Sequence, residues 1–485
     1  GRSLPQGVAA FYQQRAYHPA WQDPARLDAL LAELADLRFD GLNPNEYSLQ
    51  ELTRGRARLQ DMTSVTEQAA LDVLATRACL LAMVHLHLGK LTPADLDPKW
   101  NFAEQPYALD KEAAAINSAV EQSAVADLFN RARPPQAAYQ GLREGLRRLY
   151  AIADQGGWPL LPDGPSLKPG MRDARVPLLR QRMVAAGLLT EKGAGSELFD
   201  EILADSVKQF QREQYLDVDG AVGKSTRAVL NVPVEVRINQ VRANLERGRW
   251  LLHEIKGDFV LVDIAGFSIH FYRNGQPVWS SRVQVGRPFR STPIFKSRVT
   301  YFTFNPTWTI PPTIFKEDVL PKVRKDPDYL AKNQWQALDS AGKPLDPATI
   351  DWNRPGNILL RQAAGPANPL GQVAIRFPNP YAVYLHDTPS KSQFGKGMRA
   401  FSSGCIRVER PLELVELLFN DPQKWSREQI EAAIATGATR DVGLVTPVPI
   451  LLAYYTVAVG GDGRILFKHD IYDRDREVLA ALDRR

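Results

Sequence analysis

The apolar residues of this 485-residue chain change their spacing near residue 257. Before residue 155 they recur three and four positions apart, as in the leucines between residues 27 and 37, which predicts amphipathic helices. From Phe259 onward, β-branched and aromatic residues form short runs separated by turns such as Asn274-Gly275, which predicts strands and hairpins. A single core rarely serves a chain this long, so we expect a multidomain α+β protein.

Proline and glycine gather between residues 155 and 170, where we place a linker. A polar insert at about 311–357 interrupts the strand-rich part, and long inserts of this kind often act as lids over a site. The predicted domains are a helical scaffold at 1–155, a small helical module at 166–232, a mostly-β domain at 257–445 and a C-terminal segment at 446–485 that packs on the rest.

The charge balance is mildly basic, with 60 Lys and Arg residues against 55 Asp and Glu residues and a net charge of +5. A solvated surface of mixed sign is the ordinary interpretation of such a balance, and attraction to a polyanion (nucleic acid, membrane or cell wall) is the alternative. No dense run of Lys and Arg occurs, which argues against nucleic acid as a partner.

The two cysteines, Cys79 and Cys405, exclude a disulfide framework, so cysteine pairing does not reveal the compartment. Cys79 lies in an apolar helical pattern and is predicted to be a small buried hydrophobe. Gly1 is not followed by a basic and then apolar leader, and the apolar run from Ile450 to Val459 is too short to span a bilayer. We therefore expect that any targeting segment is absent from this chain.

Two short segments carry the predicted chemistry. Residues 381–388 read as a strand that contains His386, and Cys405 follows a turn of small residues at 402–404, nineteen positions after the histidine. A nucleophilic cysteine needs a turn that exposes the sulfur, a base within reach and amide donors for an oxyanion. We predict that His386 removes the thiol proton of Cys405, or forms an ion pair with it that lowers the thiol pKa.

The turn before the cysteine is predicted to supply the rest of the site. Ser403 and Gly404 allow a close approach of the main chain, and the amides around Gly404 and Cys405 are expected to form an oxyanion hole. Arg407 is expected to add positive potential or to bind a carboxylate. A cysteine after a glycine with one histidine nearby is more often an inert pair, so these residues alone do not establish catalysis.

In their wider context the two segments resemble the catalytic signature of the L,D-transpeptidases, in which a histidine is followed after a short interval by Ser-x-Gly-Cys-x-Arg. This chain has Ser403 where the commonest form has a second histidine, and Asp387 where a glycine or serine often follows the first. It is similar to the large Gram-negative branch, which reads His-Asp-Thr-Pro and then Phe-Ser-Ser-Gly-Cys-Ile-Arg. The pattern does not assign the third catalytic partner.

Other segments extend the resemblance. Residues 304–311 resemble the wall of the family's cleft, in which Trp308 is either a cleft residue or a core aromatic. The Phe210-Gln211 pair and the turn at 218–223 resemble the peptidoglycan-binding module of cell-wall enzymes, and both also suit a core and a turn without further function.

The resemblance implies a reaction on peptidoglycan stem peptides. Cys405 would attack the carbonyl of the third, diamino residue of a tetrapeptide stem, release D-alanine and form a thioester. The side-chain amine of a neighbouring stem would then resolve the thioester into a 3→3 cross-link, with His386 moving the proton in both halves. The residues expected to contact the substrate are Trp308, Tyr384, Asp387 and Arg407.

The resemblance also implies that no metal or other cofactor takes part. It implies carbapenem β-lactams as covalent inhibitors at Cys405, and a periplasmic or cell-envelope location with other cell-wall synthesis enzymes as candidate partners.

Two alternatives stay open. If water resolved the thioester, the protein would be an L,D-carboxypeptidase, and the sequence does not separate these activities because they differ in acceptor access and lid closure. The second alternative is a non-catalytic peptidoglycan-binding scaffold, against which the joint presence of Cys405 and His386 argues. A papain-like protease is excluded because its cysteine precedes its histidine along the chain, whereas here it follows.

Overall fold

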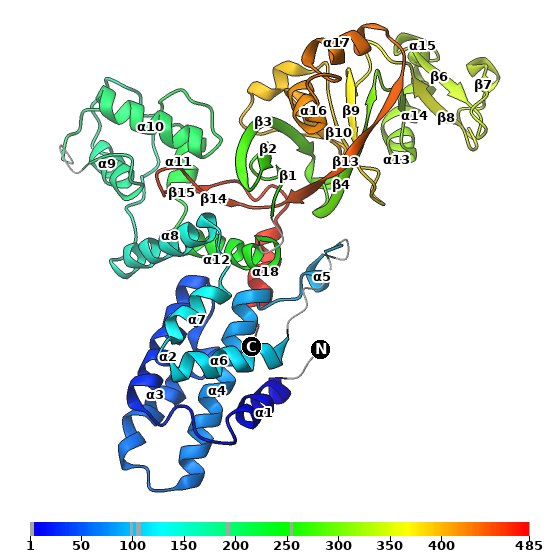
Figure 1. Cartoon of the computed structure of the whole chain (residues 1–485). Coiled ribbons are helices and arrows are strands. Elements are labelled where there is room, and N and C mark those ends of the chain that lie inside the picture. Colours follow the sequence, from blue (N-terminus) through cyan, green and yellow to red (C-terminus); the bar gives the residue numbers. More distant parts are fainter. Residues whose placement is uncertain (1–3, 98–99, 103–107, 191–194, 253–255, 485) are drawn as a thin grey trace. The chain divides into compact units, whose positions relative to one another are not determined.

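The computed structural model describes residues 4–97, 100–102, 108–190, 195–252 and 256–484. The chain forms two compact units (Figure 1), of which the first comprises Gly1–Ile255 and Tyr455–Arg485 and the second comprises Lys256–Tyr454. The polypeptide therefore crosses from one unit to the other twice.

Helices build the N-terminal part of the first unit, as the sequence predicted. They are α1 (Leu4–Gln14), α2 (Pro24–Asp36), α3 (Leu49–Arg58), α4 (Val65–Leu88), α5 (Pro93–Leu96), α6 (Leu109–Glu121), α7 (Val125–Ala132) and α8 (Ala137–Asp154). At the start of α2 the Asp23 side chain accepts a hydrogen bond from the main-chain N–H of Ala25 (2.9 Å), and Pro24 occupies the first turn. Leu27, Leu30 and Leu34 then fall on one buried face.

Helix α4 lies in the core of this helical part. In the described chain it is the one helix that is long and apolar enough to cross a membrane. Its side chains, among them Leu80 and the fully buried Cys79, instead share one apolar cluster with Phe11 and Trp21. The helix therefore has the surroundings of a core helix, and the prediction of Cys79 as a buried hydrophobe is confirmed.

A small helical module follows, with α9 (Val176–Ala185), α10 (Glu201–Glu213) and α11 (Lys224–Leu230) around a core of its own. The Gln211 side chain holds the turn after α10, since its Nε2 donates to the carbonyl of Ala221 (2.9 Å) and its Oε1 accepts from the N–H of Gly220 (2.9 Å). Gly220 has φ +73°, which favours glycine. The Phe210-Gln211 pair and the turn at 218–223 thus have a clear structural role.

The C-terminal residues return to the first unit. Strands β14 (Val457–Val459) and β15 (Ile465–Phe467) and helix α18 (Arg474–Leu482) lie there with the long helix α12 (Val234–Leu251). Val457 shares a core with Tyr139 of α8 and Leu245 of α12. The predicted boundary at residue 446 falls inside a strand of the second unit, because the apolar run from Ile450 continues the pairing of that strand to Ala453.

A nine-stranded sheet forms the second unit, in the order β11-β3-β12-β10-β9-β4-β13-β1-β2. Its strands are β1 (Phe259–Asp263), β2 (Ser268–Arg273), β3 (Gln276–Gly286), β4 (Phe295–Phe304), β9 (Val373–Arg376), β10 (Leu385–His386), β11 (Ala400–Ser402), β12 (Ile406–Val408) and β13 (Arg440–Ala453). The long strand β3 also pairs with β2, so the sheet closes on itself. Helices α16 (Pro411–Phe419) and α17 (Arg427–Ala435) complete this domain, and α16 packs on β9 and β13.

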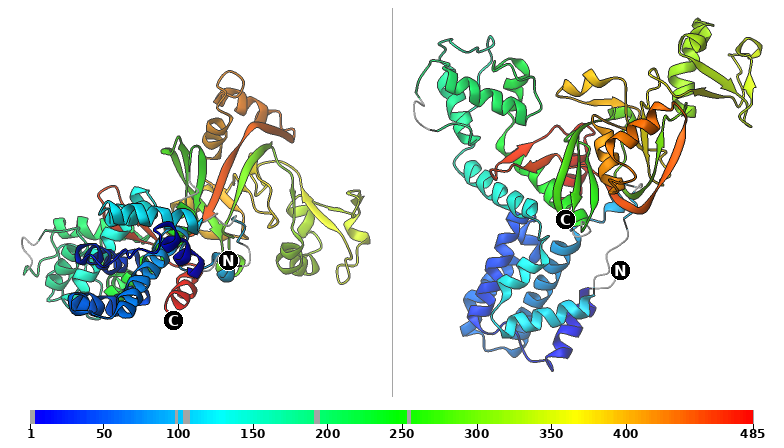
Figure 2. Two further views of the ribbon diagram at one scale, coloured as in Figure 1. Left: turned by 60° about the horizontal axis from the view of Figure 1, so that its bottom comes forward. Right: turned by 45° about the horizontal axis from the view of Figure 1, so that its top comes forward.

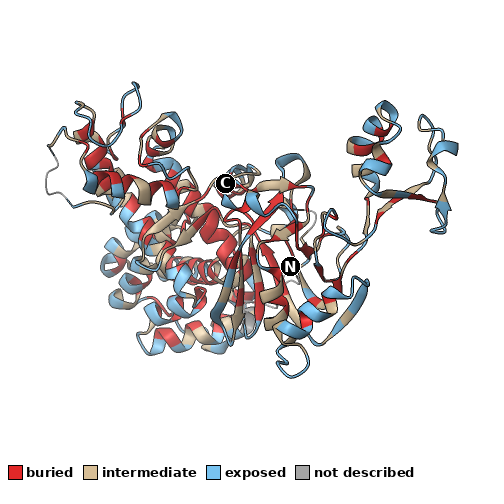
Figure 3. Cartoon of the chain, turned by 90° about the horizontal axis from the view of Figure 1, so that it is seen from above, coloured by how far each residue is buried: buried red, intermediate tan, exposed pale blue. Residues whose placement is uncertain are grey.

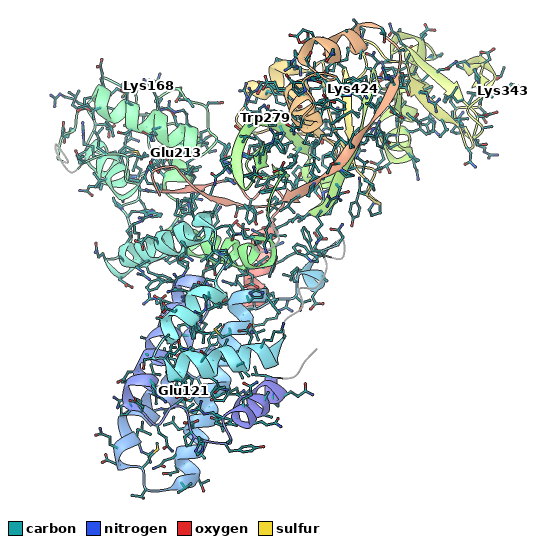
Figure 4. All side chains as sticks on the ribbon, viewed as in Figure 1. Glu121, Lys168, Glu213, Trp279, Lys343 and Lys424 are labelled. Atoms are coloured by element: carbon teal, nitrogen blue, oxygen red, sulfur yellow. The ribbon has the colours of Figure 1, made fainter. Side chains whose placement is uncertain are left out.

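The predicted insert has strands as well as helices. Strands β5 (Trp308–Thr309), β6 (Trp335–Leu338), β7 (Pro344–Leu345) and β8 (Leu359–Gln362) form an antiparallel sheet, beside the helical segments α13 (Pro312–Ile314), η6 (Phe315–Val319), α14 (Leu320–Lys325) and α15 (Tyr329–Lys332). The insert has its own core, and it projects from the large sheet in both views of Figure 2. Much of its surface is exposed in Figure 3, and Lys343 lies at its outer end in Figure 4.

Candidate active site

Two neighbouring parallel strands, β10 and β12, place the predicted catalytic residues. Leu385 pairs with Ile406 and His386 pairs with Arg407. Side chains alternate between the two faces of a sheet, so the fully buried Leu385 and Ile406 mark the core face. The residues one position away, namely Tyr384, His386, Cys405 and Arg407, therefore project together from the other face.

These side chains line a cleft with a volume of about 750 Å³. The insert contributes the opposite wall, from Trp308 in β5 to Ile314 in α13. Trp308 also packs edge-on against Trp335 within the insert, with ring centroids 6.2 Å apart. Both interpretations of Trp308 therefore apply, because one residue serves the core of the insert and the wall of the cleft.

His386 is buried and held by a main-chain carbonyl. Its Nδ1 lies 2.5 Å from the carbonyl oxygen of Asp387. Because a carbonyl only accepts, Nδ1 carries a proton toward Asp387, and the carbonyl of Pro369 also contacts the ring. Burial, followed by the positive charge of Arg407, lowers the pKa of His386 to about 3, although the Asp387 carbonyl opposes the shift. The imidazole is therefore neutral at physiological pH.

The Cys405 sulfur is half-buried in the same cleft. Its thiol donates to the carbonyl oxygen of Ala382, with an Sγ–O distance of 3.6 Å. Burial raises the pKa of this thiol, while hydrogen bonds from Tyr384 and the charges of Arg376 and Arg407 oppose the rise. In the part of the chain that the structure describes, no hydrogen bond joins Sγ to the imidazole. The resting site thus brings a neutral thiol and a neutral imidazole into one cleft.

The cysteine loop (residues 402–405) is fixed by side-chain hydroxyls. Ser402 Oγ accepts from the N–H of Gly404 (3.1 Å) and donates to the carbonyl of Cys405 (2.5 Å). Thr292 Oγ1 donates to the carbonyl of Gly404 (2.8 Å), and Gly404 has φ +118°, a conformation that requires glycine. The N–H of Gly404 is therefore already bonded to Ser402 in the resting site, and its part in an oxyanion hole stays a prediction.

Two amides of the loop remain for an oxyanion. Among the described residues, neither the N–H of Ser403 nor that of Cys405 has a hydrogen-bond partner. Ser403 is exposed at the cleft, where its hydroxyl accepts from Arg290 Nη1 (3.1 Å). The predicted catalytic role of Ser403 therefore rests on its main-chain N–H, because its hydroxyl is bonded to Arg290.

Asp387 does not occupy the predicted substrate position. Its side chain is buried away from the cleft, where Oδ2 accepts from the N–H of Gln372 (2.9 Å) and Oδ1 lies 2.6 Å from Lys391 Nζ. The carboxylate therefore fixes the local chain, and only the carbonyl of Asp387 reaches the site, through His386. Sequence adjacency to the histidine could not show this, because side chains alternate in direction along a strand.

Two arginines that the sequence analysis missed line the cleft. Arg376, in β9, has its guanidinium carbon 4.1 Å from the ring centroid of Tyr384, and Arg290 follows β3. Arg376 and Arg407 make the cleft positive, whereas the charge of Arg290 is already paired with Asp318 and Glu317; no carboxylate side chain from the described residues lines the cleft itself. A local motif search could not find them, because the topology of the sheet brings these distant segments together.

Family models match three parts of the chain. The model described as "L,D-transpeptidase catalytic domain" matches residues 257–447. Models described as "Putative peptidoglycan binding domain" and "Scaffold domain" match residues 172–230 and residues 6–146.

A curated relative from Haemophilus influenzae, named "Putative L,D-transpeptidase", is 35% identical over 225 residues, which are 46% of this chain. The match spans only 45% of that relative's length.

Among solved structures, the L,D-transpeptidase (residues 123–326) of Xylanimonas cellulosilytica is 14% identical, with a TM-score of 0.20, and covers 60% of this chain and 99% of its own. An L,D-transpeptidase from Mycobacterium smegmatis is also 14% identical, with a TM-score of 0.20, over 40% of this chain and 58% of its own. TM-scores this low add no weight to the assignment. On these matches, the chain carries an L,D-transpeptidase catalytic domain, a peptidoglycan-binding domain and an N-terminal scaffold domain.

Proposed function

We propose that the cleft catalyses L,D-transpeptidation on peptidoglycan, which forms 3→3 cross-links with release of D-alanine. The observation that carries the proposal is the placement of Cys405 and His386 on one face of two neighbouring strands, inside one cleft. A nucleophile and a base that share an accessible cleft are the minimum for acyl transfer through a covalent intermediate.

In the first half, Cys405 Sγ attacks the carbonyl carbon of the third residue of a tetrapeptide stem while its proton passes to His386 Nε2. The N–H groups of Ser403 and Cys405 are placed to stabilise the oxyanion, and one such donor is typically worth about 3 kcal/mol. The carbon–nitrogen bond to D-alanine then breaks, and His386 gives its proton to the departing amine. A thioester on Cys405 remains.

In the second half, the side-chain amine of a third residue on a neighbouring stem attacks the thioester carbon. The amine proton passes to His386, the carbon–sulfur bond breaks, and the thiol of Cys405 recovers its proton. The new amide is the 3→3 cross-link, and the two half-reactions balance without a metal, a redox partner or another cofactor.

The charge of the cleft suits this substrate. A stem peptide carries carboxylates, and Arg376 and Arg407 line a cleft to which the described residues contribute no carboxylate side chain. A cleft of one sign concentrates ligands of the opposite sign. We assign Arg407, Tyr384 and Trp308 to substrate contact, and the insert to a lid over the acyl-enzyme.

The decisive experiment is incubation of the full chain with disaccharide tetrapeptide, followed by mass spectrometry of the products. A cross-linked dimer formed with loss of D-alanine is expected, and the Cys405→Ala variant should form none. Tripeptide alone would indicate an L,D-carboxypeptidase, and unchanged substrate would indicate a non-catalytic scaffold.

Carbapenems provide an independent test of the thiol. Their strained amide carbonyl is open to the same attack, so imipenem should raise the intact mass of the chain by one adduct that Cys405→Ala abolishes. A wild-type mass that stays unshifted would count against Cys405 as the nucleophile.

The substrate implies a cell-envelope, periplasmic place of action. There, the peptidoglycan-binding domain would hold the enzyme on the wall, and the helical scaffold domain would contact other cell-wall synthesis enzymes.

A further inference from the structure

A second cavity lies in the first unit, where α9 and α10 of the peptidoglycan-binding domain meet α8, α12 and β15. Its volume is about 360 Å³. Aromatic rings and arginines dominate its lining, and the residues that matter below are Trp158, Arg182, Glu213, Arg237, Arg464 and Phe467.

Two of these arginines are buried without a carboxylate. Arg182 is 4% exposed, donates from Nε to the carbonyl of Leu230 (3.0 Å) and has its guanidinium carbon 4.0 Å from the ring centroid of Trp158. Its Nη1 has no hydrogen-bond partner among the described residues. Arg237 is 8% exposed, and its guanidinium carbon lies 4.4 Å from the ring centroid of Phe467.

Arg237 also lacks a counter-ion. Its Nη1 and Nη2 donate to the amide oxygens of Gln240 (2.8 Å) and Gln214 (3.3 Å), and its Nε has no partner among the described residues. Glu213 lines the same cavity (its position on α10 is labelled in Figure 4), but both of its oxygens bind Arg464, at 2.7 and 3.1 Å. The acid in the cavity is therefore already paired.

Elsewhere in this unit, buried arginines have carboxylate partners. Arg180 binds Asp200 at 2.5 Å from the same helix that carries Arg182. Arg133 binds Asp40 at 3.1 Å, and Arg249 contacts Glu246. An unpaired buried charge is expensive, so proteins keep one mainly where something else supplies the partner.

The pKa values differ in the same way between the arginines with a carboxylate partner and those without one. Burial, together with the neighbouring Arg237 charge, lowers the pKa of Arg182 to about 9, and burial lowers that of Arg237 to about 10. For Arg133 the charges of Asp40 and Glu33 outweigh the effect of burial, and its pKa is raised.

We infer that this cavity is a binding site for a carboxylate of a peptidoglycan stem peptide, held by the guanidinium groups of Arg182 and Arg237. Trp158 and Phe467 would pack against the apolar part of the peptide. A further cavity of about 590 Å³ shares Gln214, Arg237 and Phe467 with the first, but Asp470, Asp473, Asp475 and Asp483 also line it, so the carboxylate is assigned to the first cavity. The inference rests on the proposed function in one respect, namely that peptidoglycan is the polymer the chain meets.

Hydrogen-exchange mass spectrometry on the full-length Cys405→Ala chain tests the site, because this chain cannot consume the probe. The probes are disaccharide tetrapeptide and the same compound with every carboxyl group amidated. The free-acid probe should slow exchange in residues 176–187 and 462–468, and the amidated probe should not.

Point variants test the two arginines. Arg182→Met and Arg237→Met should each weaken binding of the free-acid probe at this site about tenfold or more, because each removes a charge-assisted hydrogen bond. Arg212→Met removes an exposed arginine of α10 that does not line the cavity, so it is the charge-matched control.

Melting temperature separates binding from a structural role. Because Arg182 is an unpaired buried charge, Arg182→Met should melt at the wild-type temperature or above it. A fall in melting temperature with unchanged probe binding would show that Arg182 only anchors Leu230 and Trp158, and it would overturn the proposal. Equal protection by the amidated probe, or protection that survives in Arg182→Met, would overturn it too.

Failure here is distinguishable from failure of the proposed function. Imipenem acylation is measured on chains with Cys405 intact, and Arg182→Met should acylate at the wild-type rate. Normal acylation without protection at residues 176–187 would contradict the second binding site and leave the proposed activity intact. Protection there without any acylation would support the second binding site and contradict the proposed activity.

Discussion

Cys405 and His386, the proposed nucleophile and base, rest in their neutral forms in this cleft. Burial depresses the pKa of His386 and raises that of Cys405, and the sulfur donates to a carbonyl instead of pairing with the imidazole. Of the two roles predicted from the sequence, proton removal by His386 fits this arrangement and a resting ion pair does not. The thiolate would then form only when a substrate is in place.

A pH profile of thiol alkylation tests this state. The raised pKa means that the reactive thiolate is scarce at neutral pH and appears as pH rises, so the iodoacetamide rate should climb through a midpoint above that of an unburied cysteine thiol. Measurement between pH 5 and 10 by intact mass would show it, with Cys405→Ala as the blank. A rate already at its plateau at pH 6 would show that the thiolate–imidazolium ion pair exists in the resting enzyme.

Tyr384 is expected to matter through its contact with the sulfur. Its hydroxyl hydrogen-bonds to Cys405 and favours the thiolate, so Tyr384→Phe should slow imipenem acylation about fivefold, the value of one ordinary hydrogen bond. Tyr301→Phe, at a partly exposed position of β4, is the control. Equal rates in the two variants would remove Tyr384 from the site's chemistry.

At this scale the sequence predicted that Cys405 and His386 share one cleft, and it missed the residues that support them. Cys405 and His386 stand in a recognisable local pattern. The use of the Gly404 amide by Ser402, and the turning of the Asp387 carboxylate toward Gln372 and away from the cleft, depend on tertiary contacts. A local pattern holds no information about such partners.

Among the elements, the insert is joined to the cysteine loop by one side chain. Arg290 binds Asp318 (2.5 Å) and Glu317 in η6, and it also donates to the hydroxyl of Ser403. It is largely buried although both acids are partly exposed, so each pair is worth at most about 1 kcal/mol. Arg290 thus forms a weak connection, here called the latch, between the insert and the loop that carries Cys405.

Removal of this latch should loosen the insert. Arg290→Gln is expected to speed chymotryptic cleavage within residues 311–357 about three- to tenfold, because opening becomes cheaper by the strength of the lost pairs. Arg298→Gln, which removes a contact to Pro447 outside the insert, is the control. If the insert is a lid, imipenem should also slow cleavage of the wild type, and equal cleavage with and without it would argue against closure.

The sequence predicted the strands of the large sheet better than the form of the insert. Runs such as Phe259–Asp263 alternate clearly, whereas β5 and β7 have two residues each and depend on their partners. A mostly-β domain was expected and is observed, and its sheet closes on itself because β3 is long enough to pair with β2 at one end and with β11 and β12 at the other.

For the whole molecule, the division into two units predicts two unfolding transitions. The tail is tied into the first unit by a buried network, in which Thr456 Oγ1 donates to Asp475 (2.7 Å) and accepts from Asn244 (2.6 Å). The sequence predicted that the C-terminal segment packs on the rest, but it could not name these partners, because Thr456 and Asn244 lie more than 200 positions apart.

Thr456→Val should therefore lower one transition only. It leaves two buried polar groups unsatisfied, at about 1–3 kcal/mol in total, which corresponds to a fall of about 2–6 °C for a unit of this size. Calorimetry would resolve it, with the imipenem adduct used to identify the transition of the catalytic unit. Thr53→Val, an exposed position in α3, is the control, and a shift of both transitions would show that the units unfold together.

The double crossing of the chain has a consequence for how such an enzyme can be rebuilt. Because β1 and β13 run parallel as neighbours, the chain enters the catalytic unit before the start of β1 and leaves it beyond the end of β13, so these ends lie on the order of 25 Å apart. The unit is thus a continuous cassette whose removal leaves a gap that a linker of roughly eight residues could bridge. A different hydrolase or transferase whose two ends are similarly spaced could be inserted in its place. The first unit, which contains the peptidoglycan-binding domain, would keep its own chain connectivity.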